Sequence, residues 1–272
     1  MDAKILYVSQ EVDPYIPDTE MAMMGRLVTE SLFSKGTEVR NFMPKFGGVN
    51  ERKNQLHEVI RLSGVNIIIN DTDHPLLIKV ASVQPSRMQV YFIDSDDFFQ
   101  KRRVFRDKNG VFYPNNDERL IFFSRGVLET VRSLVWKPDI IHCNGFFGSL
   151  VPYYVKNTVY HDDPLFAEAK VVVNLYGKAF EETLSEEMHK KLKSDAGGSK
   201  GVRYYKEPTY DNVMLGAIAF SEAVVVCSDD VNPELMAFAK QKRKKIIEYC
   251  PIDERIAQIH ELYEGLMPKK KK

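Results

Sequence analysis

Short continuous apolar runs alternate along the chain with segments whose apolar residues recur at helical spacing. Residues 5–8 form the first apolar run, residues 21–33 show the helical spacing, and residues 39–43 form the next run. Gly36 lies between the last two segments, where a glycine commonly ends a helix. A strand, a helix and a second strand in this order predict the βαβ unit of a parallel sheet.

Residues 57–93 break this alternation. They contain three strand-like runs, at residues 65–69, 76–82 and 88–93, and polar residues 70–73 form the turn between the first two. Since no helical segment separates the runs, we expect them to form an antiparallel insertion in the sheet.

The strand–helix alternation returns in the second half of the chain. The expected helices are residues 119–135, 147–155, 212–220, 233–239 and 253–266, and the expected strands are residues 139–143, 170–174 and 223–227. Pro152 weakens the second of these helices, and residues 193–209, which contain three glycines, predict a mobile loop. The whole pattern predicts an α/β fold with a Rossmann-like, doubly wound, mostly parallel sheet and an antiparallel insertion.

Composition and charge exclude several classes of protein. Of the 272 residues, 44% are hydrophobic and 28% charged, which is typical of a globular protein. The 38 basic and 38 acidic residues cancel, so no overall basic field favours nucleic acid. No apolar run approaches the roughly 18 residues of a membrane-spanning helix, and the first apolar run is too short for a signal peptide. We therefore expect a cytoplasmic protein with neither nucleic acid nor a membrane as partner.

The cysteines and histidines predict neither a metal nor a cofactor. Cys143, Cys227 and Cys250 are scattered, which favours buried, reduced thiols over disulfides or a zinc site. The histidines other than residue 142 show no metal-ligand spacing. The acidic residues Asp94, Asp96 and Asp97 resemble a segment of a known family, identified below, and this resemblance implies a structural turn rather than a metal site.

Five motifs carry a resemblance to a known family. They are SQEVDP at residues 9–14, GTEVRNFMPKFG at 36–47, NDERLIFF at 116–123, WKPDIIHC at 136–143 and NVMLGAIAFSEAVVVCS at 212–228. In order and spacing they resemble the N-terminal half of bacterial glycogen and starch synthases over residues 4–235. In the third motif, the acidic residues at a predicted helix start favour helix capping over catalysis.

The resemblance implies a Rossmann-like N-terminal domain of a GT-B glycosyltransferase, the half that holds the growing glucan. The family's activity is glucosyl transfer from a nucleotide-glucose to an α-1,4-glucan. The family's second domain, which carries most sugar-nucleotide contacts, has no room in 272 residues. We therefore expect one half only, with residues 1–250 as the domain and residues 251–272 as a C-terminal helix and basic, solvated tail.

The phosphate-binding loop departs from the family pattern. Pro17, Asp18, Thr19 and Glu20 stand where the resemblance places Lys-Thr-Gly-Gly. Glycines let the backbone approach a phosphate, and a helix N-terminus favours an anion. Here the lysine is lost and two carboxylates occupy the loop. Either Asp18 or Thr19 is expected to cap the following helix, and the acidic loop is expected to repel an anion.

The cleft residues that the resemblance implies depart from the pattern too. Asn144 replaces the cleft histidine and can hydrogen-bond a sugar hydroxyl or a phosphate oxygen, but it cannot titrate. Phe146 replaces a tryptophan and either stacks on a glucose ring or packs in the core. His142 is structural or functional, and Glu11 keeps the family's carboxylate after the first strand. Tyr176 follows a strand and could line a cleft.

A further family histidine is missing: either Val173 stands in its place ahead of Asn174, or the alignment slips by one residue, and neither alternative restores it. These losses predict little or no glucosyl transfer by the isolated chain. A non-catalytic module that binds a glucan, a metabolite or a protein is the alternative, and a different small-molecule enzyme on the same scaffold is a third. A nucleotide-sugar or an α-glucan is the expected ligand. The face that meets the second domain in the family is expected to be polar, oligomeric or covered by a partner chain.

Overall fold

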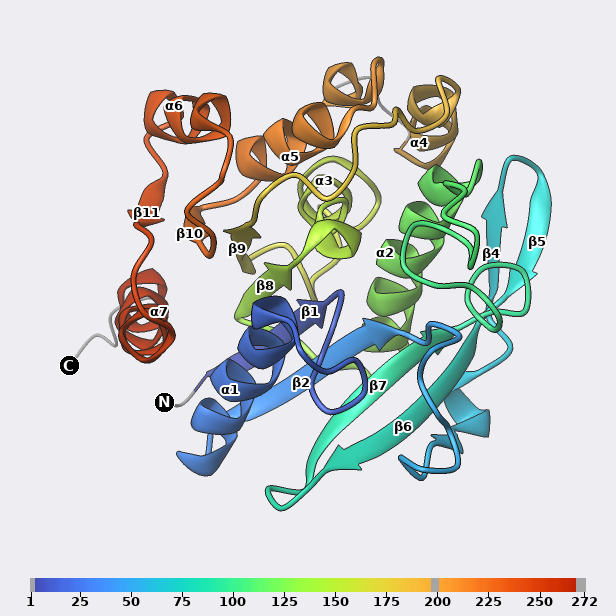
Figure 1. The fold of residues 1–272 in the computed structure, drawn as a ribbon, viewed down its shortest axis with the longest axis horizontal. Coiled ribbons are helices and arrows are strands. Elements are labelled where there is room, and N and C mark those ends of the chain that lie inside the picture. Colours follow the sequence, from blue (N-terminus) through green and yellow to red (C-terminus); the bar gives the residue numbers. More distant parts are fainter. Residues whose placement is uncertain (1–2, 197–200, 268–272) are drawn as a thin grey trace.

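The computed structural model describes residues 3–196 and 201–267. Within them, nine strands form one sheet in the order β11-β10-β9-β8-β1-β2-β7-β6-β3 (Figure 1). Their bounds are β1 Lys4–Ser9, β2 Glu38–Pro44, β3 His57–Glu58, β6 Leu77–Val83, β7 Met88–Asp94, β8 Ile140–Asn144, β9 Lys170–Leu175, β10 Ala223–Val226 and β11 Lys245–Ile247. β4 (Asn66–Ile69) and β5 (Thr72–Pro75) form a separate hairpin.

The helices follow the strands as the sequence pattern predicts for a doubly wound fold. They are α1 Glu20–Ser34, α2 Asn116–Ser133, α3 Val151–Asn157, α4 Met188–Ala196, α5 Tyr210–Ala219, α6 Pro233–Gln241 and α7 Ile252–Leu266. Short 3₁₀ turns lie at Ile60–Leu62, Phe146–Gly148 and Val202–Tyr205.

The parallel part of the sheet runs from β11 to β7, and β6 and β3 continue it in antiparallel orientation. The mostly parallel α/β fold with an antiparallel part is therefore confirmed. β1 lies between β2 and β8, so the strand order changes direction there, and the carboxyl ends of β1 and β8 border the crevice where doubly wound folds place ligands.

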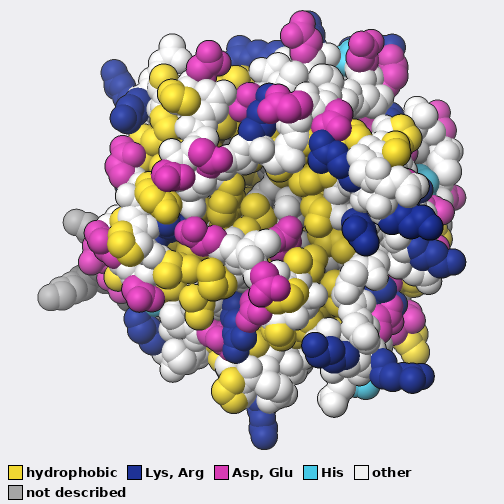
Figure 2. Space-filling model, viewed as in Figure 1, with side chains coloured by type: hydrophobic (Ala, Val, Ile, Leu, Met, Phe, Trp, Pro, Cys, Tyr) yellow, Lys and Arg dark blue, Asp and Glu magenta, His cyan; other side chains and the backbone are white. Residues whose placement is uncertain are grey.

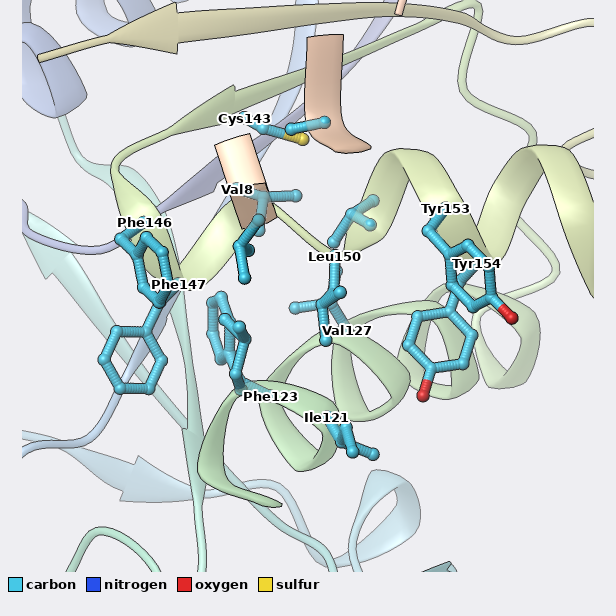
Figure 3. Close-up of a cluster of buried hydrophobic side chains, with 14 of the residues drawn as sticks. Val8, Ile121, Phe123, Val127, Cys143, Phe146, Phe147, Leu150, Tyr153 and Tyr154 are labelled. Atoms are coloured by element: carbon cyan, nitrogen blue, oxygen red, sulfur yellow. The ribbon is translucent and has the colours of Figure 1, made fainter. Parts of the chain in front are cut away.

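Alternating side chains along the parallel strands separate two hydrophobic cores, and a third buried cluster includes side chains of β2, β6 and β7. Leu6 and Val8 pack with α2, α3 and α5 in the larger core, whereas Ile5 and Tyr7 pack with α1 and α7 in the smaller one. Figure 3 shows side chains of β1, β8, α2 and α3 converging in the larger core. Tyr263 is one of the α7 residues buried in the smaller core. The predicted division at residue 250 stays a prediction.

Two predictions about elements are wrong. Residues 193–196 belong to α4 and residues 202–205 to a 3₁₀ turn, so most of the expected mobile loop is ordered, while residues 197–200 lie outside the described residues. The buried side chains of Val202 and Tyr205 anchor this turn. The prediction relied on the glycines and did not consider these two side chains. The first run of the insertion, β4, pairs with β5 rather than with the main sheet.

Proline and short strands explain the remaining differences. The helix expected at residues 147–155 is a 3₁₀ turn followed by α3, in which Pro152 occupies the first turn, where no backbone N–H is needed. β3, β5 and β11 were not predicted, because strands of two to four residues leave too short a pattern.

The acidic residues at the start of α2 do not cap it. Asp117 and Glu118 both accept from Lys191 Nζ at 2.7 Å, so they tie α2 to α4. Asn115 stands at the cap position, and its side chain makes no capping bond. In the segment expected to be a structural turn, Asp94 is buried and pairs with Lys79 at 2.8 Å.

No helix among residues 3–196 and 201–267 is long and apolar enough to span a bilayer. The lysines of the expected basic tail lie outside the described residues.

Candidate functional site

A layer of polar side chains lies at the carboxyl ends of the central strands, on the face covered by α1 and α7. Strand alternation places them there, because they continue the rows of the smaller core. The members are Ser9 of β1, Asn144 of β8, Asn174 and Tyr176 at the end of β9, and Cys227 after β10. We call these five residues the polar layer.

Asn144 ends β8 and is fully buried. Its Oδ1 accepts from the Tyr176 hydroxyl at 2.6 Å and from Asn174 Nδ2 at 2.8 Å, and its Nδ2 donates to the Met21 carbonyl at 3.0 Å. Three of the four hydrogen bonds that the amide can make are therefore formed within the chain. The structure brings Asn144 and Tyr176 together, as the sequence-based site implied, but each binds the other.

His142 lies beneath this group, fully buried. Its Nε2 is 2.6 Å from Asn174 Oδ1, and its Nδ1 is 2.5 Å from the Tyr263 hydroxyl. Because Asn174 donates through Nδ2, its Oδ1 must accept, so Nε2 carries the proton and Tyr263 donates to Nδ1. Burial lowers the pKa of His142 to about 4. The imidazole is therefore neutral near pH 7 and has no free nitrogen for a ligand.

Tyr176 is partly buried, and burial raises the pKa of its hydroxyl well above the usual value. The neutral phenol donates to Asn144. The next residue, Gly177, lies against the carboxylate of Asp230, since a Cβ there would come within 2.2 Å of an Asp230 oxygen. The chain after β9 therefore passes this acidic side chain closely.

Phe146 is part of the core. Its ring is 3% exposed, stacks on Tyr210 at 5.1 Å and meets Phe180 edge-on at 5.0 Å. Figure 3 places it beside Phe147 in the large buried cluster. No face of the ring is open to a sugar in this structure.

Glu11 fastens the loop between β1 and α1. Its Oε2 accepts from the Thr19 hydroxyl at 2.7 Å and its Oε1 from Gln10 Nε2 at 3.3 Å. Thr19 in turn accepts from the Ala22 N–H at 3.0 Å, so Thr19 rather than Asp18 is the N-cap of α1. The carboxylate of Glu11 therefore serves helix capping in this structure.

The loop that replaces the phosphate-binding sequence is exposed and acidic. Pro17, Asp18 and Thr19 are exposed, and Asp18 adopts φ 73°, a left-handed conformation that glycine takes most easily. Glu20 opens α1 and accepts from Arg255 Nη1 of α7 at 2.5 Å. The N-terminus of α1 thus already holds a carboxylate from its own first turn.

Arg255 is a site residue that sequence reasoning missed. Its side chain is buried, and its Nη2 donates to the Cys250 carbonyl at 2.5 Å. A signal existed, since Arg255, Ile259 and Tyr263 recur at a spacing of four, which puts a cation on the buried stripe of a helix. Asn174 and Tyr263 were also missed, because their roles depend on strand neighbours that no single sequence reveals.

The Glu20–Arg255 pair is expected to stabilise the fold measurably. In a double-mutant cycle of Glu20→Gln and Arg255→Met, followed by urea denaturation, we expect a coupling of about 1–2 kcal/mol. The Arg255 side chain is 1% exposed and that of Glu20 39%, so water screens only one partner. The exposed pair Lys240–Glu248 is the control and should couple by about 0.5 kcal/mol or less. Equal coupling in both cycles would contradict this expectation.

Among the residues that the structure describes, no group of three or more histidine, cysteine, aspartate or glutamate side chains is arranged to hold a metal ion.

The fold and the polar layer define a Rossmann-like α/β domain of the kind that forms each half of a GT-B glycosyltransferase. The family model of the starch synthase catalytic domain matches residues 4–247, and the chain belongs to this family.

Relatives among curated proteins agree with this assignment. The glycogen synthase of Chlorobium limicola is 37% identical over 199 residues, which are 70% of this chain and 40% of that protein. The glycogen synthase of Chlorobium luteolum is 37% identical over 195 residues, 68% of this chain and 40% of that protein. The chain thus spans about 40% of the length of these relatives.

The fold is shared with a solved plant structure. The catalytic domain of starch synthase IV from Arabidopsis thaliana, bound to ADP and acarbose, superimposes with a TM-score of 0.72 at 18% identity. The match covers 91% of this chain and 51% of the plant chain. The predicted family resemblance is therefore confirmed, and at this identity the structural match establishes the fold alone.

Proposed function

We propose that this chain is a glycogen-synthase-type half domain that retains the fold of the glucan-holding side but transfers no glucose by itself. One observation carries the proposal: the polar atoms at the carboxyl ends of β8 and β9 are bonded to one another. Asn144, Asn174 and Tyr176 form a closed set, and neutral His142 completes it. A ligand hydroxyl would have to displace these bonds.

The chemistry of glucosyl transfer explains why this matters. The pyrophosphate leaving group needs cations and N–H donors, and the acceptor must be held over the anomeric carbon with water excluded. Glu20 and Asp18 place negative charge at the helix start that would face the phosphates. Loss of a single preorganised donor typically costs on the order of 100- to 1000-fold in rate. Several such losses together favour a chain without transferase activity.

Transfer of labelled glucose onto glycogen from ADP-glucose and UDP-glucose tests the proposal. We expect no incorporation above a blank without protein, with the glycogen synthase of Chlorobium limicola as the positive control. Incorporation that disappears in Asn144→Ala and Tyr176→Phe would overturn the proposal and make the chain a minimal synthase.

The ligand classes are part of the proposal. ADP and acarbose are bound by the Arabidopsis protein; for this chain we propose retained binding of an α-glucan and weak binding of a nucleotide-sugar. Retardation in native gels containing glycogen, together with calorimetry using ADP-glucose, tests both. Tight ADP-glucose binding would contradict the expected effect of the acidic loop.

A second candidate function is assembly with a partner chain. Figure 2 shows hydrophobic side chains gathered in a hollow between the positions of α1 and α5. Met23 on α1 and Tyr249 after β11 are 44% and 49% exposed. We propose that a second copy, or a chain carrying the family's second domain, covers these exposed apolar side chains. Light scattering after gel filtration, with Met23→Glu as the variant, would show a mass that falls towards the monomer; a monomer at every concentration excludes the second copy.

A further inference from the structure

A surface pocket lies at the opposite end of the strands from the polar layer. Its volume is about 430 Å³, within the range of small-molecule sites. It is lined by Asn157, Gly201, Arg203, Tyr204, Ala219, Phe220 and Lys242. These residues come from the carboxyl-terminal ends of α3, α5 and α6 and from the turn Val202–Tyr205. Because α5 ends just before β10 begins, the pocket borders the amino ends of the parallel strands.

The charged side chains that line the pocket are both cations. Arg203 and Lys242 are exposed, and neither forms an ion pair with any carboxylate among the described residues. Lys242 belongs to the run 240–245, in which five of six residues are basic. Figure 2 shows Lys and Arg side chains at the corner formed by α6. In a chain of zero net charge, this corner is a local excess of positive charge.

The neighbouring carbonyl and carboxylate groups are already bonded to other side chains, so they do not neutralise Arg203 and Lys242. The α5 carboxyl end would repel an anion, but Lys244 Nζ donates to the Ala219 carbonyl at 3.0 Å and to the Ser221 carbonyl at 2.5 Å. Glu222 is the nearby acid, and it is occupied by Lys156 Nζ at 3.1 Å and the Val171 N–H at 2.6 Å. Burial lowers the pKa of Lys244, and the charges of Lys242 and Lys156 lower it further, which shows how closely the cations gather.

The pocket also has an aromatic wall, whose rings meet edge-on and do not lie in one plane. Tyr204 meets Phe220 edge-on at 6.0 Å and Phe238 at 6.1 Å, and the Arg203 guanidinium lies 4.9 Å from the Tyr204 ring centre. Gly201, at φ 87°, packs so closely that a Cβ would come within 2.6 Å of the Phe220 ring. The wall is thus built from packed rings rather than from free side chains.

We infer that this pocket binds a phosphate monoester of a ring compound, either a nucleotide or a sugar phosphate. Arg203 Nη2 donates to the Tyr204 hydroxyl at 3.0 Å, which orients the guanidinium, and its other N–H groups suit the phosphate oxygens. The Lys242 ammonium adds a second charge against the dianion. The ring of the ligand would lie against Tyr204 and Phe220, since both bases and sugars pack on aromatic faces. The pocket is separate from the polar layer, so its occupation does not depend on glucosyl transfer.

Calorimetric titration of the full chain with AMP, glucose 1-phosphate and inorganic phosphate tests the inference. We expect AMP or glucose 1-phosphate to bind more tightly than inorganic phosphate. The tighter of the two shows whether the pocket prefers a nucleotide or a sugar phosphate. Arg203→Met and Lys242→Met should each weaken that binding about 10-fold, as charge-assisted contacts imply. Lys240→Met is the matched control: it removes the same charge from the same helix but does not line the pocket, and it should change affinity less than about 2-fold.

Three results would overturn the inference. They are no binding of any of the three compounds at millimolar concentration, equal weakening by Lys240→Met, and unchanged affinity in both pocket variants. Arg203 and Lys242 are exposed, so folding of the variants is expected and is checked by circular dichroism. Tyr204→Leu is a further variant, which should weaken binding of the ring compound and leave the affinity for inorganic phosphate unchanged.

Discussion

Replacing Arg119 with methionine is expected to lower the free energy of unfolding by about 3–5 kcal/mol. The guanidinium is fully buried at the start of α2. It donates to the carbonyls of Phe98 at 2.9 Å and Arg103 at 2.7 Å, and also to the Val104 carbonyl and the Asn116 side chain. Methionine fills much of the space but leaves these acceptors without donors.

Among the residues that the structure describes, no carboxylate pairs with the charge of Arg119. Burial lowers its pKa to about 9, so it stays protonated at neutral pH, and the rings of Phe46, Phe99, Tyr113 and Phe147 surround it at 4.9–5.7 Å. Its contribution therefore comes from the carbonyls it binds and the loop it orders. Lysine, with one ammonium group, cannot reach all of them and is expected to recover only part of the loss.

Urea denaturation measures the effect, with Arg103→Met as the control. The side chain of Arg103 is exposed, so that variant should change stability by less than about 0.5 kcal/mol. A loss below about 1 kcal/mol for Arg119→Met would show that water or neighbouring donors replace the guanidinium.

Acidification from pH 7 to pH 4 is expected to lower the free energy of unfolding by about 3 kcal/mol through His142 alone. The ordinary histidine pKa is 6.5, and burial lowers that of folded His142 to about 4. Between these two pKa values, His142 is protonated in the unfolded chain but mostly neutral in the folded chain. The stability contribution is therefore complete above pH 6.5 and is lost as the pH falls towards 4, by about 1.4 kcal/mol per pH unit.

The variant His142→Gln isolates this effect. It is expected to be less stable at pH 7, because bonds to Tyr263 and Asn174 are lost, but its stability should fall less steeply between pH 6.5 and 4. Burial also lowers the pKa of His260, so some dependence on pH persists in the variant. The exposed His161→Gln is the control and should keep the native slope. Identical slopes for native protein and His142→Gln would contradict the assignment.

Periodicity predicted the fold well where elements are long. The 15 residues of α1 and the six of β1 carry enough pattern to be recognised, and the order of the motifs predicted the family. The three-residue β11 and the helix α4 were missed, because their stability depends on neighbours distant in sequence. Tertiary packing, rather than local propensity, decides such segments.

For the candidate site, the sequence predicted which residues follow the strands but not the hydrogen bonds between their side chains. The sequence placed Asn144 and Tyr176 after adjacent strands, and adjacent parallel strands bring them together. The side-chain amide of Asn144 is hydrogen-bonded through both its oxygen and its nitrogen, to Tyr176, Asn174 and Met21. These three bonds could not be predicted from the sequence, because they depend on how three segments distant in sequence meet in the fold.

The two strands at the ends of the nine-stranded sheet have a consequence for assembly. β3 has two residues and β11 three, and β11 begins with Lys245. Short, charged outer strands offer few unpaired backbone groups, so another chain gains little by adding a strand there. β3 and β11 are therefore poor templates for edge-to-edge pairing. A second copy or partner that meets β3 or β11 would attach mainly through side chains, and such a contact can be removed by single surface substitutions.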